Sequence, residues 1–119
     1  MSVDLTGFGH AESATISAAT DTMAIGDQGI VQNVTVSSVI TLPSTVVGYS
    51  FTFRVGAPGI TVAISPAALD LIAGNGFTAA DDKDLVFTNQ PAGSFVTIIG
   101  NGTTGWNVTA ISGTATREA

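Results

Sequence analysis

Residues 49–55 read Tyr-Ser-Phe-Thr-Phe-Arg-Val, and residues 60–64 read Ile-Thr-Val-Ala-Ile. In the first stretch, aromatic and aliphatic side chains alternate with polar ones. Such alternation places the apolar side chains on one face of a β-strand and the polar ones on the other. Residues 106–110 read Trp-Asn-Val-Thr-Ala and repeat the pattern, with Trp106 and Ala110 on the same face. The sequence therefore predicts several strands, each with one buried face.

Turn-forming residues separate these strands at short and even intervals. Gly and Asn accept positive φ angles and Pro fixes φ, so all three favour turns. Residues 74–76 and 100–102 both read Gly-Asn-Gly, which suits tight hairpins. Short strands with such turns predict an all-β fold, a compact antiparallel β-sandwich or barrel-like domain over residues 29–119.

The segment of residues 66–73 carries a mixed signal. Ser65 and Pro66 stand where a helix would begin, and Gly74 stands just beyond its end, a pattern typical of helix termini. The flanking sequence, however, has the character of strands. We therefore expect a strand or an irregular turn here, with a short helix as the alternative.

The composition predicts self-association. About a third of the 119 residues are Thr, Val or Ile, which suit a pleated sheet. Only 10% are charged, against about 25% in an average soluble domain. A lone monomer of this composition would expose mainly small, hydroxylated and aliphatic side chains, so we expect copies of the chain or a partner to cover part of its surface.

Residues 1–28 differ from the rest of the chain because small and polar residues there surround isolated apolar ones. This pattern predicts an extended N-terminal arm that docks on a neighbouring subunit, and a frayed terminus or a single edge strand is the alternative. The apolar residues that would make the docking contact are Leu5, Phe8, Ile16, Met23 and Ile25.

Charge and residue content exclude several classes of protein. With three basic residues and a net charge of −6, the chain cannot form the cationic surface that nucleic-acid binding requires. Its apolar runs are too short for a transmembrane helix, so we expect no membrane partner. Residues 1–25 lack the pattern of a secretory signal, which predicts synthesis in a cytoplasm. Because there is no Cys, disulfides, thiolate metal sites and Cys nucleophiles are excluded.

Groups that could support catalysis are few, and we expect no enzyme activity and no cofactor. The single imidazole, His10, has no orienting partner nearby in the sequence. Asp81, Asp82 and Asp84 form the one acidic cluster. Their spacing does not match a calcium loop, which favours a solvated turn, although cation binding by these three carboxylates stays open. Trp106 could stack on a sugar, but its alternation with Val108 favours the core.

The order of strands and turns as a whole is informative. It runs through Ile40–Pro43, Gly48–Phe51, Ile60–Pro66, Ile72–Gly76, Gly93–Ile98 and Gly102–Val108, the last of which contains a Gly-Thr-x-x-Trp-x-Val pattern. This order resembles a β-module found in structural proteins of tailed phages, in capsid decoration proteins and in tail or head fibres. The resemblance spans about residues 30–117, and the final pattern is its most specific part. One departure is Ala115, near which such proteins often carry an aromatic residue.

Members of this group act as homotrimers, and the resemblance implies a homotrimer here. It thus implies a virion structural protein, made in the host bacterial cytoplasm. The short chain favours a decoration (cement) protein that binds the major capsid protein on the outer surface of the phage head and stabilises it. In that role residues 1–28 would contact the capsid through Leu5, Phe8, Ile16, Met23 and Ile25. The alternative is a tail-fibre, head-fibre or baseplate component that contacts a host receptor or glycan. Residues expected in the core or at the trimer interface are Phe51, Phe53, Val55, Val62, Ile64 and Trp106.

Overall fold

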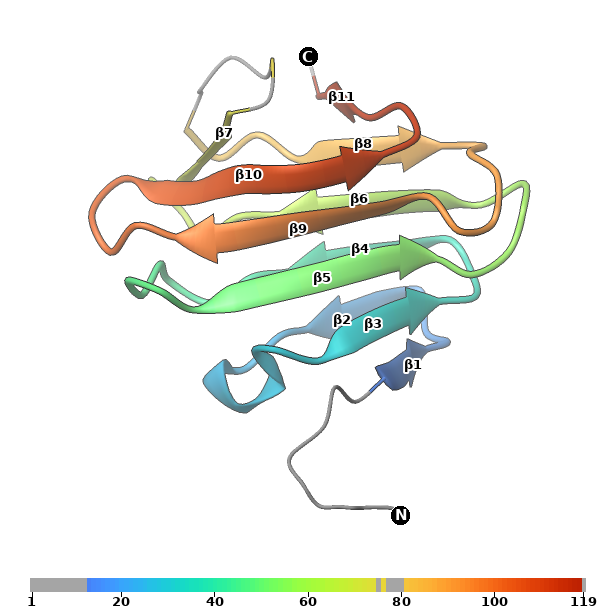
Figure 1. Cartoon of the computed structure of the whole chain (residues 1–119), viewed down its shortest axis with the longest axis horizontal. Helices are drawn as coiled ribbons and strands as arrows, with labels where there is room; N and C mark the ends of the chain where they lie inside the picture. The colour runs from blue at the N-terminus through green and yellow to red at the C-terminus, as the bar shows by residue number, and fades with distance from the viewer. Residues whose placement is uncertain (1–12, 75, 77–80, 119) are drawn as a thin grey trace.

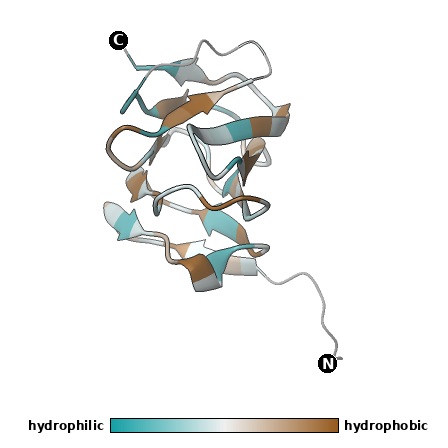
Figure 2. Ribbon diagram, turned by 90° about the vertical axis from the view of Figure 1, so that its left-hand side faces the viewer, coloured by the Kyte–Doolittle hydropathy of each residue, from teal (hydrophilic) through white to brown (hydrophobic). Residues whose placement is uncertain are grey.

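The computed structural model describes residues 13–74, 76 and 81–118. Two β-sheets pack face to face in these residues (Figure 1; Figure 2), together with one short 3-10 helix, η1 (Ile25–Asp27). The six-stranded sheet contains, in spatial order, β1 (Ser13–Ile16), β3 (Val31–Val34), β5 (Ser50–Val55), β9 (Phe95–Gly100), β10 (Gly105–Ser112) and β7 (Leu71–Ala73). The five-stranded sheet contains β11 (Thr116–Arg117), β8 (Leu85–Thr88), β6 (Thr61–Ser65), β4 (Ser38–Thr41) and β2 (Thr20–Thr22). The expected all-β, two-sheet architecture is confirmed.

The strands are not purely antiparallel, which corrects the prediction for the sandwich. From β1 to β6 the chain alternates between the two sheets, so that each strand lies beside the strand two places earlier in the sequence. The pairs β1–β3, β3–β5, β2–β4 and β4–β6 are all parallel. Each connection between consecutive strands from β1 to β6 therefore carries the chain to the opposite sheet, and none forms a hairpin within one sheet. The N-terminal half is therefore coiled like a short β-solenoid.

The C-terminal half continues both sheets with antiparallel strands. β9 pairs with β5 and then with β10, while β8 pairs with β6 and then with β11. Residues 101–104 connect β9 directly to β10, which confirms the hairpin expected there. Asn101 holds this loop: its side-chain oxygen accepts hydrogen bonds from the amides of Thr103, Thr104 and Gly105 at 2.8–3.0 Å.

Aromatic and aliphatic side chains from both sheets fill the space between them. Phe51 meets Trp106 edge to face at 5.4 Å between ring centroids, and Phe53 stacks beside Phe51 at 6.2 Å. The six residues expected in the core or at a trimer interface all lie in this core, each at most 1% exposed. They are Phe51, Phe53, Val55, Val62, Ile64 and Trp106. Trp106 is therefore buried in the core, and its ring is not exposed for stacking on a sugar.

The alternation predicted for residues 106–110 breaks at a β-bulge. The pairing of β10 with β9 shifts register between Val108 and Ala110. One extra residue reverses which side chains face inward. Ala110 is therefore exposed, while Ile111 packs against the core.

The described part of residues 1–28 belongs to the two sheets. β1 and β2 pair with β3 and β4, and Ile16 and Met23 are only 1% and 4% exposed. This corrects the expectation that they would contact a neighbour, because both side chains pack within their own chain. Of the remaining residues expected to dock, Ile25 is 38% exposed, and Leu5 and Phe8 lie outside the described residues.

The segment with mixed signals is not helical. Residues 66–70 form a turn, in which Leu69 adopts a φ of +72°, and β7 follows. This confirms the expected strand or turn. The turn also places Asp70 against the loop of residues 43–48, where its carboxylate accepts a hydrogen bond from the amide of Thr45 at 2.9 Å.

Candidate assembly surfaces

The described residues form no pocket for a small molecule. Among them, no group of three or more His, Asp or Glu side chains converges where it could hold a metal ion. Asp81, Asp82 and Asp84, which are close together in the sequence, therefore do not converge on a common point in the described structure. His10 lies outside the described residues. No helix in the described ranges has the length and apolar character needed to cross a bilayer. The surfaces that remain to be considered are the outer faces, ends and edges of the sheets.

The most buried carboxylate has a structural role. Asp70, 9% exposed, binds the amide of Thr45. The Thr45 hydroxyl in turn donates to the carbonyl of Gly105 at 2.5 Å and accepts from the amide of Gly102 at 3.1 Å. Together these bonds hold the loop of residues 43–48 against both ends of the β9–β10 hairpin loop. The role of Asp70 is therefore to stabilise the fold.

One carboxyl has an altered acidity. Burial raises the pKa of Asp84, a hydrogen bond from the Ser65 hydroxyl opposes this rise, and the nearby charges of Glu118 and Asp82 add to it. Glu118 is held close because its side chain accepts from the amide of Asp84, and its own amide donates to the Asp84 carbonyl, both at 2.9 Å. Two carboxylates therefore lie together at one corner of the five-stranded sheet.

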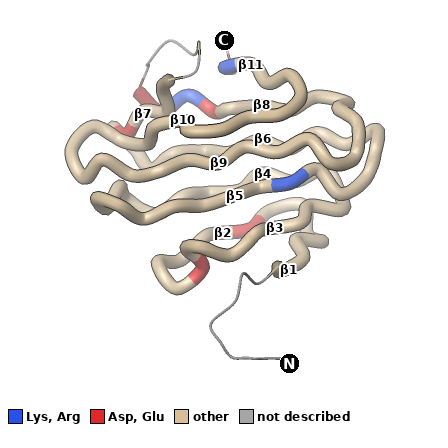
Figure 3. The backbone as a smooth tube through the Cα atoms, in the orientation of Figure 1, with Lys and Arg blue, Asp and Glu red and all other residues tan. Residues whose placement is uncertain are grey.

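Charged residues are distributed unevenly over the described structure (Figure 3). Asp21 and Asp27 lie near the end formed by β1 and β2. The other charged residues lie near the opposite end, around β7, β8 and β11, with the exception of Arg54 on β5. Those near the opposite end are Asp70, Asp81, Asp82, Lys83, Asp84, Arg117 and Glu118. The two broad sheet faces are therefore almost uncharged.

The outer face of the six-stranded sheet carries hydroxyl and apolar side chains. Along its central strand β9, the outward residues are Phe95, Thr97 and Ile99, and all three are partly buried. Register places Thr97 beside Thr52 of β5, and Phe95 beside Arg54. Described outward residues on neighbouring strands include Val31, Asn33, Ser50, Asn107 and Thr109.

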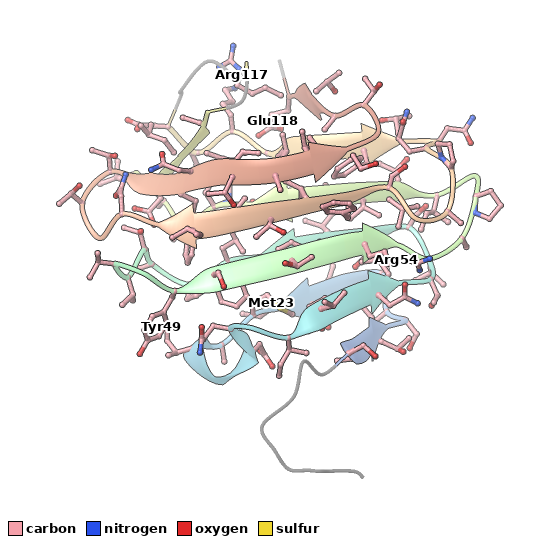
Figure 4. All side chains as sticks on the ribbon, viewed as in Figure 1. Met23, Tyr49, Arg54, Arg117 and Glu118 are labelled. Atoms are coloured by element: carbon pink, nitrogen blue, oxygen red, sulfur yellow. The ribbon has the colours of Figure 1, made fainter. Side chains whose placement is uncertain are left out.

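Five side chains on this face form hydrogen bonds within the chain. The Thr52 and Thr97 hydroxyls share a hydrogen bond of 2.9 Å, and the Thr109 hydroxyl donates to the Thr97 carbonyl at 3.2 Å. The Arg54 guanidinium donates to the Asn33 side-chain oxygen at 2.6 Å. Arg54 lies near the end of β5, as labelled in Figure 4. Groups already bonded within the chain lose little when water is removed.

The five-stranded sheet presents a different outer face. Register aligns one outward row across the strands, with Val39, Ala63 and Val86 at its centre. Val39 is 44% exposed. The next outward row contains Thr22, Thr41 and Ser65 and ends at the corner where Asp84 and Glu118 lie. This face is therefore bordered by negative charge.

The amino-acid sequence contains a signal that locates these faces. In β5 and β9 the polar positions of the alternating pattern are Ser, Thr and a single Arg, with no Glu or Lys. Outward strand positions that face water normally include many more charged residues. The overall composition shows the scarcity of charge, and only the individual strands show where it lies.

Comparison of the chain with protein-family models, with curated proteins and with solved structures finds no significant match.

Proposed function

We propose that this chain is a structural protein of a phage particle, a capsid decoration protein that acts as a homotrimer and stabilises the head. Its partners are copies of itself and the major capsid protein on the outer surface of the capsid. It needs no cofactor and catalyses no reaction. One observation carries the proposal: the two broad sheet faces are almost uncharged, on a chain with net charge −6.

A trimer would bind the capsid by avidity. Once one protomer is bound, the remaining contacts form at a high effective concentration, so weak contacts add up to strong attachment. The two sheets of the described residues offer broad, nearly uncharged faces that can supply such contacts. The resemblance of its strand order to phage decoration proteins supports the same role.

Undecorated capsids provide the direct test. Purified protein is added in excess, and the capsids are sedimented and washed. We expect the protein to pellet in a fixed ratio to the major capsid protein and to raise the temperature at which the capsids rupture. Pelleting without saturation, or no pelleting, would contradict the decoration role.

A second candidate is a tail-fibre, head-fibre or baseplate component that contacts a host receptor or glycan. The observation that favours it is the end of the molecule formed by β1 and β2. Among the described residues, each of these strands pairs on one side only, with β3 and β4. Two parallel edges side by side could accept another coil of the same kind, as in an elongated fibre. Binding to host cells or to their surface glycans, without binding to capsids, would favour this candidate.

A further inference from the structure

We infer that copies of this chain contact one another through the outer face of the six-stranded sheet. This inference rests on the proposed function, since it names the surface through which the proposed trimer assembles. We call this surface the β9 face, and we define it by residues that lie outward on four adjacent strands. They are Val31, Ser50, Thr52, Arg54, Phe95, Thr97, Ile99, Asn107 and Thr109.

Charge is the first argument that a second copy occupies this face. Each copy carries a net charge of −6, so two copies repel, and carboxylates inside the contact would add most to this repulsion. The β9 face contains no Asp or Glu, and its single charged side chain, Arg54, is positive. Contact through this face therefore keeps the carboxylates of neighbouring copies apart and in water.

Hydrogen bonding is the second argument. The Thr52 and Thr97 hydroxyls bond to each other, and the Thr109 hydroxyl bonds to a backbone carbonyl. Because each of these hydroxyls already takes part in a bond within the chain, burying it against a neighbour costs less than burying a hydroxyl that has only water as a partner. Phe95 and Ile99 on the same strand add apolar surface that gains from burial.

Size is the third argument. Strands lie about 4.8 Å apart and rise about 3.3 Å per residue. The four strands that carry the β9 face contain 24 residues and therefore cover roughly 380 Å² before side-chain relief is counted. The five strands of the other sheet contain 18 residues and cover roughly 290 Å². Stable interfaces bury about 800 Å² per partner. The β9 face thus comes closer to the required area than the face of the five-stranded sheet.

The five-stranded sheet is the weaker candidate for a further reason. Asp84 and Glu118 lie at its corner. Contact through this face would bring both carboxylates close to another copy of the same net charge and would remove water from them.

Matched charge insertions test the inference. Thr97→Glu and Asn107→Glu place a carboxylate on the β9 face, and Thr41→Glu places one at an exposed position on the opposite sheet. All three change the net charge equally. We expect the first two to convert the trimer to an 11.9 kDa monomer in sedimentation, with at least a tenfold rise in the dissociation constant, and Thr41→Glu to stay trimeric. Circular dichroism checks that each variant is folded.

A labelling experiment gives a second readout that leaves the face intact. The chain contains no Cys, so Asn107→Cys and Thr41→Cys each introduce a single thiol. At a concentration where the protein is trimeric, we expect a maleimide reagent to modify Asn107→Cys at least five times more slowly than Thr41→Cys. On dilution to the monomer, the two rates should become similar.

The outcomes separate failure of the inference from failure of the proposed function. A trimer that persists in folded Thr97→Glu and Asn107→Glu, with equal labelling of the two thiols, would overturn the β9 face as the contact. A wild-type chain that stays monomeric at every accessible concentration would overturn self-association itself. Capsid binding by the wild type, together with a β9 face that is freely labelled, would leave decoration standing and refute only this surface.

Discussion

Two polar side chains in the core have no hydrogen-bond partner among the described residues. The Ser38 hydroxyl and the Trp106 indole nitrogen are both fully buried without one. The indole is accompanied by a large apolar ring system, which gains more from burial than its N–H loses. Ser38 has no such compensation, because its side chain is little more than the hydroxyl. It is therefore a position where the sequence is not optimal for stability.

Replacing this hydroxyl should not harm the fold. In Ser38→Ala we expect the free energy of unfolding to stay equal or to rise by about 1 kcal/mol, because an unsatisfied buried group is removed. Ser94→Ala is the matched control: Ser94 is also buried, but its hydroxyl donates to the Pro91 carbonyl at 2.8 Å. That variant should lose about 1 kcal/mol. Urea unfolding measures both, and a larger loss in Ser38→Ala than in Ser94→Ala would refute the argument.

The raised pKa of Asp84 predicts a pH dependence. A carboxyl whose pKa is higher in the folded state than in the unfolded chain binds its proton more tightly when folded. Its contribution to stability is therefore lost as pH rises from the ordinary value of 3.8 through the folded pKa. Asp84→Asn should accordingly be more stable than the wild type at neutral pH, by about 0.5 kcal/mol or less because the group is partly exposed.

Thermal unfolding across this pH range provides the measurement for Asp84→Asn. The difference from the wild type should vanish once the pH falls below 3.8. Ser65→Ala is the control of opposite sign, since it removes the hydrogen bond that favours the ionised form. It should lower stability at neutral pH. An Asp84→Asn variant that is less stable at neutral pH than in acid, relative to the wild type, would show that the pKa is lowered instead.

At the scale of elements, the parallel pair β7–β10 depends on a glycine. Gly105 begins β10 with a φ of +148°, and a Cβ atom there would overlap the backbone of Leu71. The strand can pair with β7 only because this position has no side chain. Gly105→Ala must therefore either distort β10 or separate the two strands.

We expect Gly105→Ala to lower the free energy of unfolding by about 3 kcal/mol. Amide hydrogen exchange should become faster at Ile72 of β7 but not in β4 or β6. Gly26→Ala is the control, because a Cβ there meets no atom within 4 Å and the backbone angle is ordinary. It should change stability by less than about 0.5 kcal/mol. Equal effects of the two substitutions would contradict the close approach of β10 to β7.

Several elements could be predicted from the sequence because their evidence is local. The alternation in residues 49–55 is long enough to identify β5 and its buried face. Asn101 and Gly102 mark the hairpin through turn chemistry. The pairing direction could not be predicted, because parallel and antiparallel strands show the same period of two. β1 and β2, with four and three residues, are too short to show alternation, so Ile16 and Met23 resembled isolated residues of an arm.

The β9 face could not be predicted from local sequence patterns for a related reason. Thr52 and Thr97 are 45 residues apart, and they meet only because β5 pairs with β9. Composition gave the shortage of charge but not its location. The bulge after Val108 also carries no Gly or Pro to mark it, and so the exposure of Ala110 could not be foreseen.

At the scale of the whole molecule, the balance between like charge and apolar contact governs association. Each copy carries −6, and the acidic ends of neighbouring copies repel through the solvent. Salt screens this repulsion: the Debye length falls from about 30 Å at 0.01 M to about 8 Å at 0.15 M. Contacts between uncharged sheet faces, by contrast, depend little on salt. The proposed trimer should therefore strengthen as salt is added.

The expected strength of the trimer follows from the area of the β9 face. A face of roughly 380 Å² lies below the usual 800 Å² per partner, so we expect a trimer that dissociates on dilution into the micromolar range rather than an obligate one. Sedimentation equilibrium at 0.01 M and 0.15 M salt measures this directly. The dissociation constant should fall at least threefold at the higher salt. An association that weakens with salt would mean that ion pairs, such as Arg54 with a carboxylate of the next copy, dominate the contact instead of its uncharged surface.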